Sequence, residues 1–339
     1  MPFSARGRFL LLTVMYLLST GPASPQGNLQ HSPLYAISIL DSQTVISVGD
    51  NGVVATTRNG GKSWKFETVL GIKSELYGVY FLNAKKGWIV GAAGYILQTV
   101  DGGKKWRKQK SGTSNHLISV CFVDTSVGWA FGHDGTILKT TNGGNSWTAQ
   151  KSGIKKPLFS GFFSDRNIGT LVGGSGAMLE TTDGGKRWVE HVIGIPKFFY
   201  SITYLNNSIG WIVGGYGVVL KTTDAGATWE NLSFDEISQR IYSHSFFYSV
   251  QFVDTTAGWI VGDGGKMLKS TDGGASWVEQ SSGTQEVLYA IRWRDRTDGW
   301  TTGGHGTILH TTNGGKVWKN VTAESSRQPY KKSGTPERK

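Results

Sequence analysis

An octapeptide that recurs seven times constrains the fold of this sequence more than any other feature. One copy reads STDGGASW at residues 270–277, and the closing tryptophans of successive copies lie 42, 41, 41, 41, 48 and 41 residues apart. A repeat of this length is typical of propellers and solenoids. The first copy contains Gly-Lys-Ser, but Thr56 stands where a phosphate-binding loop requires glycine. The octapeptide is therefore not a nucleotide-binding loop.

Each repeat contains four short runs that read as β-strands joined by tight turns. In the second repeat these runs are 76–82, 87–91, 95–100 and 106–110, rich in β-branched and aromatic residues and separated by Gly, Asn and Asp. Seven such units packed around an axis bury one another's faces. The sequence predicts an all-β chain, a seven-bladed β-propeller of four-stranded antiparallel blades.

The octapeptide is interpreted as a structural turn. Its third residue, Asp or Asn, can hydrogen-bond the backbone two residues further on, and the glycine two places later permits positive φ. The closing tryptophan is expected to open the outer strand and to pack between blades. The acidic or amide residues are Asn59, Asp101, Asn142, Asp183, Asp224, Asp272 and Asn313, and the tryptophans are Trp64, Trp106, Trp147, Trp188, Trp229, Trp277 and Trp318.

These octapeptides resemble the Asp-boxes, or BNR repeats, of sialidase-like propellers. Combined with runs such as GWIVGAAGYILQT (87–99) and GWAFGHDGTILKT (128–140), they are more specifically similar to the photosystem II assembly factor family, Ycf48 or Hcf136. The resemblance covers roughly residues 34–320. It implies a non-catalytic propeller without cofactor or metal, which binds a protein, such as a membrane-complex subunit, during assembly or stabilisation of that complex.

The N-terminus predicts export. Arg6 and Arg8 precede an apolar run at 9–18, and Gly21 and Ala23 suit a cleavage site. We expect a signal peptide at 1–23, a linker at 24–33, the propeller at 34–320 and a polar, basic, disordered tail at 321–339. The mature protein would be a monomer in a periplasm or a compartment like the thylakoid lumen, or would be secreted. It would have no stable membrane anchor, although an uncleaved anchor stays open as an alternative.

The basic charge favours protein or headgroup partners over nucleic acid. The net charge falls from +11 to +9 when Arg6 and Arg8 leave, and +3 of the remainder belongs to the tail. About +6 then remains on the propeller. That charge favours acidic protein surfaces or anionic headgroups, and it is too small to indicate nucleic acid.

Blade 7 carries the most unusual first strand. Alignment of the first strands places Arg292 and Arg294 where the other blades have mostly apolar or neutral residues. A buried unpaired charge is costly, so two interpretations stay open: pairing with Asp295, Asp298 or a neighbouring carboxylate, or binding of a partner. The longer spacing places an insertion at 230–247 beside this sector. The candidate partner-binding residues are Arg292, Arg294, Arg296, Asp263, His305, Asp50, Tyr242, Phe246 and Phe247.

Enzymatic alternatives find little support in the sequence. Sialidase chemistry needs three convergent arginines, yet none occurs between Arg8 and Arg58 and none recurs at spaced first-strand positions. His133, Asp134 and His305 lack the short spacing of metal ligands. Cys121 is the sole cysteine, which excludes an internal disulfide. A secreted propeller that binds or cleaves glycans is the second hypothesis.

Overall fold

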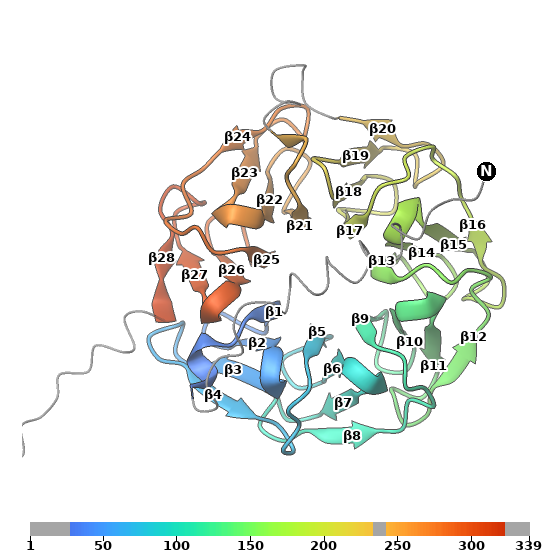
Figure 1. Cartoon of the computed structure of the whole chain (residues 1–339), viewed down its shortest axis with the longest axis horizontal. Coiled ribbons are helices and arrows are strands. Elements are labelled where there is room, and N and C mark those ends of the chain that lie inside the picture. The colour runs from blue at the N-terminus through green and yellow to red at the C-terminus, as the bar shows by residue number, and fades with distance from the viewer. Residues whose placement is uncertain (1–27, 233–241, 323–339) are drawn as a thin grey trace, which may run out of the picture.

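A computed structural model describes residues 28–232 and 242–322 of the chain. Seven four-stranded antiparallel sheets stand around a central axis, which confirms the predicted propeller (Figure 1). The predicted signal peptide, residues 24–27 of the linker, residues 233–241 of the insertion and the tail from residue 323 lie outside the described residues. No helix in the described part of the chain is long and apolar enough to cross a bilayer.

Each blade is built from four consecutive strands, ordered from the axis outward. The first strands are β1 (Leu34–Ile39), β5 (Leu76–Phe81), β9 (Leu117–Phe122), β13 (Leu158–Phe163), β17 (Phe199–Tyr204), β21 (Phe247–Phe252) and β25 (Leu288–Trp293). The second strands are β2 (Val45–Gly49), β6 (Gly87–Gly91), β10 (Gly128–Gly132), β14 (Gly169–Gly173), β18 (Gly210–Gly214), β22 (Gly258–Gly262) and β26 (Gly299–Gly303). The third strands are β3 (Val53–Thr57), β7 (Ile96–Thr99), β11 (Ile137–Thr140), β15 (Met178–Thr181), β19 (Val219–Thr222), β23 (Met267–Ser270) and β27 (Ile308–Thr311). The outer strands are β4 (Lys65–Thr68), β8 (Arg107–Gln109), β12 (Thr148–Gln150), β16 (Val189–Glu190), β20 (Glu230–Asn231), β24 (Val278–Glu279) and β28 (Lys319–Asn320).

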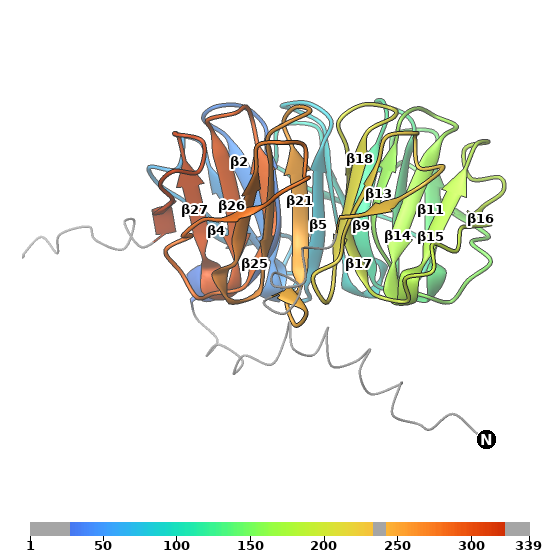
Figure 2. The same cartoon turned by 90° about the horizontal axis from the view of Figure 1, so that it is seen from above.

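The two faces of the ring carry different loops. Six short 3-10 turns join second to third strands and lie beside the connections between blades: η2 (Asp50–Gly52), η3 (Ala92–Gly94), η4 (His133–Gly135), η5 (Gly174–Gly176), η6 (Asp263–Gly265) and η7 (Gly304–Gly306). We call this side, which is the lower side in Figure 2, the connection face. The octapeptides lie on the opposite side beside the loops between first and second strands, because the N–H of Gly102 donates to the carbonyl of Lys85. We call that side the box face.

The octapeptide closes its turn over four residues, not over two as predicted. In blade 2 the Thr99 hydroxyl donates to Oδ1 of Asp101 at 2.8 Å and accepts the N–H of Gly103 at 2.9 Å. Because the threonine occupies that N–H, Oδ1 of Asp101 accepts the N–H of Lys105 instead, at 2.9 Å. The same pattern holds in all seven copies, for example from Asn59 to Ser63.

The glycine of the octapeptide is needed for two reasons. Gly144 has the predicted positive φ, at 93°. A Cβ atom there would also lie 2.9 Å from Nε1 of Trp88, which belongs to the preceding blade. The turn therefore serves as the place where one blade fits against the next.

Aromatic side chains pack against one another between neighbouring blades: a tryptophan of one blade stacks on a first-strand residue of the next blade, which in turn contacts the tryptophan of its own octapeptide. Trp129 of blade 3 stacks on Phe163 of blade 4 with ring centroids 3.7 Å apart, and Phe163 meets Trp188 edge-on at 6.0 Å. Trp188 is 8% exposed, and its Nε1 donates to Gln150 of blade 3 at 3.4 Å. Trp188 directly precedes the outer strand, which starts at Val189 and not at the tryptophan as predicted, and its indole packs into a buried cluster.

Blades 7 and 1 close the ring without sharing a strand. Trp64 of blade 1 packs edge-on against Trp300 of blade 7, with ring centroids 5.8 Å apart. The segment before β1 adds a further contact between the two blades, because η1 (Leu29–His31) packs against η7. The two turns lie so close that the carbonyl of Gln30 leaves no room for a Cβ atom at Gly306. The described part of the predicted linker therefore helps to close the propeller.

Acid pH should weaken the boxes that carry aspartate. The hydroxyl and N–H of Thr228 hydrogen-bond Asp224 and lower the pKa of its carboxyl from 3.8 to about 2. A carboxyl with a lower pKa in the folded chain stabilises the fold above the unfolded value, and this contribution is lost as the pH falls through the folded value. Asn59, Asn142 and Asn313 accept the equivalent N–H without titrating.

We therefore expect Asp224→Asn to lower the melting temperature at pH 7 and to have a shrinking effect as the pH falls from 4 to about 2. Thermal melts of both proteins across this range measure the difference. A difference that stays constant down to pH 2 would mean that the Asp224 carboxylate has no role in acid stability.

Candidate functional site

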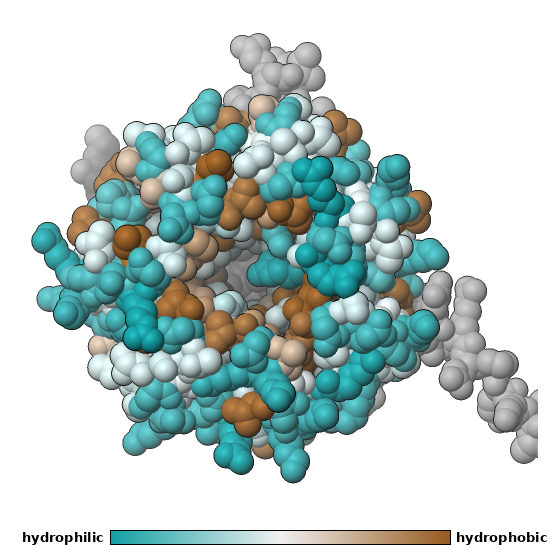
Figure 3. Space-filling model, turned by 180° about the vertical axis from the view of Figure 1, so that it is seen from behind, coloured by the Kyte–Doolittle hydropathy of each residue, from teal (hydrophilic) through white to brown (hydrophobic). Residues whose placement is uncertain are grey.

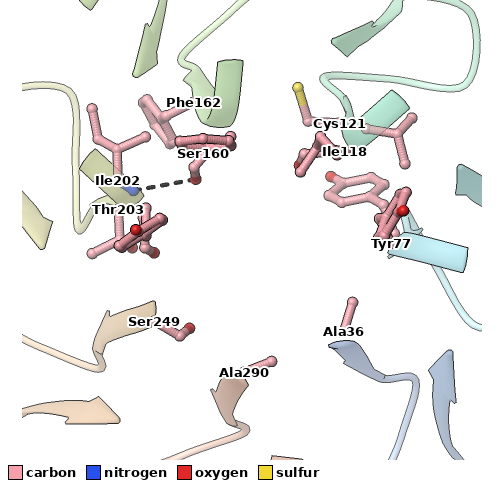
Figure 4. A pocket seen from close by; sticks show the side chains of 18 of the residues that line it. Ala36, Tyr77, Ile118, Cys121, Ser160, Phe162, Ile202, Thr203, Ser249 and Ala290 are labelled. Atoms are coloured by element: carbon pink, nitrogen blue, oxygen red, sulfur yellow. Dashed lines mark hydrogen bonds between the residues drawn. The ribbon is translucent and has the colours of Figure 1, made fainter. Parts of the chain in front are cut away.

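The first strands enclose an open cavity on the propeller axis. It has a volume of about 750 Å³, and the side chains of Figure 4 surround it. Seen from the box face, the molecule is hollowed at its centre (Figure 3). The fifth residue of every first strand lines the cavity: Ser38, Tyr80, Cys121, Phe162, Thr203, Gln251 and Arg292. This is the register that the sequence alignment singled out, and we call the cavity the channel.

Arg292 is the residue of this register that carries a permanent charge. Its Nη1 donates to the carbonyl of Ile291 at 2.7 Å and to the Ser249 hydroxyl at 3.4 Å. Within the described residues it forms no ion pair. The side chain is exposed to the channel, but the surrounding walls displace bulk water, and this desolvation lowers the pKa of its guanidinium. It stays charged at neutral pH, so a cation without a carboxylate partner faces the channel.

Arg294 and Arg296 lie elsewhere. Both follow the end of β25 in the loop on the box face, where the N–H of Gly314 donates to the carbonyl of Thr297. Nη2 of Arg294 lies 3.0 Å from Asp298 and 3.3 Å from Asp295. Arg296 pairs with Asp254 of blade 6 at 2.5 Å. Of the two interpretations of the arginines, internal pairing describes Arg294 and Arg296, whereas Arg292 forms no ion pair within the described residues.

The other candidate residues lie on the connection face or in the core. Asp50, Asp263 and His305 occupy the 3-10 turns of blades 1, 6 and 7. Asp263 accepts the N–H of Phe246 at 3.2 Å, and His305 pairs with Glu286 at 2.7 Å. These residues share a face with one another but not with Arg294 and Arg296.

The aromatic residues of the insertion differ in accessibility. Phe247 is fully buried as the first residue of β21, and Tyr242 is 8% exposed, with its hydroxyl 3.4 Å from Glu279. Phe246 is half-buried, and its ring lies 5.3 Å from Tyr216 and 6.4 Å from Tyr200. Phe246 is thus the one of the three that reaches the surface beside the channel mouth.

Aromatic side chains from six of the seven blades line the channel mouth on the connection face. The second residue of the first strand is aromatic in six blades, and neighbouring ring centroids are 5.2–5.8 Å apart. The members are Tyr35, Tyr77, Phe159, Tyr200, Tyr248 and Tyr289. In blade 3 the position is Ile118, and His116 meets Tyr77 instead, at 6.1 Å. We call these six residues the aromatic collar.

A β-bulge places the collar. The register of every first strand shifts between its first and third residues, as between Leu34 and Ala36, so the second residue is left out of the ladder. A bulge of this kind redirects a side chain, and here it turns six aromatic rings toward the axis. The pattern leaves a trace in the sequence, since an LY, LF or FY pair begins each of these six strands.

The tyrosines of the collar are neutral at physiological pH. Burial raises the pKa of the Tyr289 hydroxyl to about 12, with further contributions from the charges of Glu286 and Asp50. Burial, followed by the charges of Asp50 and its neighbours, also raises the pKa of Tyr35 well above its ordinary value. The collar therefore presents aromatic faces rather than phenolates.

The described residues offer no group of three or more His, Cys, Asp or Glu side chains suited to a metal ion. His116 and His133 lie close, with ring centroids 5.1 Å apart, and burial lowers the pKa of His133. Burial raises the pKa of the Cys121 thiol to about 12, so this thiol is not a nucleophile at neutral pH. The channel is equipped for binding through Arg292 and aromatic contacts.

Comparison with known families gives a match along most of the propeller. The family model described as photosynthesis system II assembly factor YCF48 matches residues 67–157, 151–238 and 237–331. No curated protein matches the chain by sequence.

Solved structures share the fold. A structure described as YCF48 bound to D1 peptide is 20% identical, with a TM-score of 0.68 over 84% of this chain and 92% of the other. YCF48 from Cyanidioschyzon merolae is 19% identical, with a TM-score of 0.68 over 83% and 96%. The GH74 xyloglucanase from Xanthomonas campestris is 11% identical, with a TM-score of 0.69 over 86% of this chain but 55% of the enzyme.

Proposed function

Because this chain belongs to the photosystem II assembly factor family YCF48, we propose that it is an exported, non-catalytic protein that binds a polypeptide of a membrane complex during assembly. The main support for a binding site in the channel is Arg292, a cation that is exposed to the channel and has no carboxylate partner among the described residues. Arginine and aromatic residues are the usual anchors of protein interfaces. Both meet in this channel.

The similar structure bound to a D1 peptide suggests the kind of partner. We propose that an extended segment of a photosystem II subunit, with D1 as the first candidate, enters the channel. A carboxylate of that segment would pair with the Arg292 guanidinium, which lies beside the Ser249 hydroxyl. A charge-assisted hydrogen bond of this kind is stronger than a neutral one.

Glycoside hydrolysis is the second candidate, because GH74 enzymes share the fold. That chemistry needs two carboxyl groups on either side of the scissile bond. The described lining of the channel contains Asp134 but no second carboxylate. The chain also spans only about half the length of these enzymes, at 52% and 55%. Both observations favour binding over catalysis.

A paired assay tests the function. The protein is titrated with a labelled synthetic D1 peptide and with a scrambled peptide of equal composition, and it is incubated separately with xyloglucan. The proposal predicts saturable binding of the D1 peptide alone and no release of reducing sugar. Hydrolysis of xyloglucan without peptide binding would contradict the proposal and support the glycan-directed alternative.

A further inference from the structure

The channel mouth on the connection face has a distinct sector formed by blades 7, 1 and 2. Three tyrosines of the collar meet there: Tyr35 lies 5.4 Å from Tyr289 and 5.8 Å from Tyr77, measured between ring centroids. Asp50 and Glu75 stand beside them, because the N–H of Asp50 donates to the carbonyl of Pro33, two residues before Tyr35, and Glu75 lies two residues before Tyr77. The sector therefore combines aromatic faces with two carboxylates.

The two carboxylates have no cationic partner within the described part of the chain. Asp50 accepts the N–H of Asn51 at 2.7 Å and its side-chain amide at 3.2 Å, which orients the carboxylate without neutralising it. Glu75 adds a second negative charge close to Asp50, because it directly precedes β5 and η2 packs against that strand. Glu286, the third carboxylate of this sector, is instead paired with His305.

The opposite sector of the mouth is different in charge. Lys155 lines the channel from the side of blades 3 and 4, together with the carboxylate of Asp134, and Lys197 lies over the ring of Tyr216 at 5.9 Å. Burial lowers the pKa of His133, so its imidazole adds no positive charge at neutral pH. The two lysines make this sector less favourable for a positively charged ligand than the sector of Asp50 and Glu75.

We propose that Tyr35, Tyr77 and Tyr289, together with Asp50 and Glu75, bind a lysine or arginine side chain of the partner polypeptide; this rests on the proposed function. A cation is attracted to the face of an aromatic ring, and more strongly where water is displaced. The neutral tyrosines supply the faces, and the carboxylates supply the compensating charge. We call this group the cation sector.

The cation sector also favours one orientation of a partner segment in the channel. Tyr289 and Arg292 lie three residues apart on β25, a separation of about 10 Å along a strand. A basic side chain is held at the mouth and kept from moving deeper by Arg292, which attracts a carboxylate instead. An extended partner segment with a basic residue a few positions away from an acidic residue or a terminal carboxylate fits this arrangement in one orientation.

A lysine-containing peptide provides the probe. A fluorescein-labelled hexapeptide of alternating lysine and serine, acetylated and amidated, is titrated by fluorescence anisotropy against the full chain at low and physiological salt. A peptide with norleucine in place of lysine keeps the alkyl length without the charge. The free cation tetramethylammonium, added as a competitor, distinguishes a site for any small cation from one that requires a polypeptide.

We expect the lysine peptide to bind and the norleucine peptide not to bind. Asp50→Asn should weaken binding about fivefold or more, and Tyr35→Leu should have a similar effect. The matched controls are Glu67→Gln, an exposed carboxylate on the outer strand of blade 1, and Tyr95→Leu, a tyrosine outside the channel. Both controls should leave the affinity unchanged, and melting temperatures confirm that all variants are folded.

Three results would overturn the whole inference: equal binding of the norleucine peptide, no binding of the lysine peptide, or equal losses in Asp50→Asn and Glu67→Gln. A fourth result, complete displacement by tetramethylammonium at concentrations comparable to the lysine peptide, would overturn the assignment of the site to a polypeptide. Failure of this inference can be told apart from failure of the proposed function. If the D1 peptide binds while the lysine peptide does not, the cation sector is rejected and the function stands.

Discussion

We expect Trp188→Ala to lower the free energy of unfolding by about 3–5 kcal/mol, the range observed when large aromatic side chains are removed from a core. Trp188 is 8% exposed and belongs to a buried cluster with Trp129, Phe163 and Leu171. That cluster lies between blades 3 and 4, so the cavity left by the indole would weaken one contact of a closed ring. The hydrogen bond to Gln150 would be lost as well.

A reversible denaturant titration measures the loss. Val189→Ala, the next residue in sequence and 43% exposed, is the matched control and should change stability by less than about 0.5 kcal/mol. A loss below about 1 kcal/mol for Trp188→Ala would contradict the role of the box tryptophans between blades.

Reversing the charge at Arg292 should abolish partner binding without unfolding the protein. The Arg292→Glu side chain breaks no ion pair in the described structure and faces the open channel, so the melting temperature should change by only a few degrees. Any partner carboxylate would meet a like charge. Capture of a photosystem II subunit from solubilised membranes should fall to background.

Arg294→Glu should have the opposite effect. It would place a carboxylate beside Asp295 and Asp298, which now pair with Arg294 at 3.3 and 3.0 Å, and like charges repel. We expect a lower melting temperature with capture retained, because Arg294 lies on the box face outside the channel. A folded Arg292→Glu protein that still captures the partner would exclude Arg292 from the binding site.

The sequence predicted the propeller well because its strongest signals are local and repeated. Each turn needs the same threonine, Asp or Asn, glycine and tryptophan, so the period of about 41 residues is visible without any homologue. The alignment of first strands also singled out Arg292 as unusual, and the structure shows that its register faces the channel. Strand number, order and the positive φ of the box glycines all follow from that repeat.

The binding surface was harder to predict, because it depends on where strands end and where they bulge. Arg292 and Arg294 are two residues apart, so on a continuous strand their side chains would point to the same face. However, β25 ends at Trp293, and Arg294 lies in a loop. The aromatic collar results from bulges in seven strands, which alternation alone does not reveal. Charge pairs such as Arg296 with Asp254 join residues of different blades, 42 positions apart, and need the folded ring.

Site-specific photo-crosslinking tests most directly whether the partner enters the channel. A photoreactive amino acid is placed at Thr203, on the channel wall (Figure 4), or at Val278, which is 68% exposed on the outer strand β24. Each protein is incubated with native photosynthetic membranes and irradiated, and cross-linked partners are identified by mass spectrometry. A photosystem II subunit cross-linked from Thr203 but not from Val278 is the predicted result. Cross-linking of that subunit from Val278 alone would contradict binding in the channel.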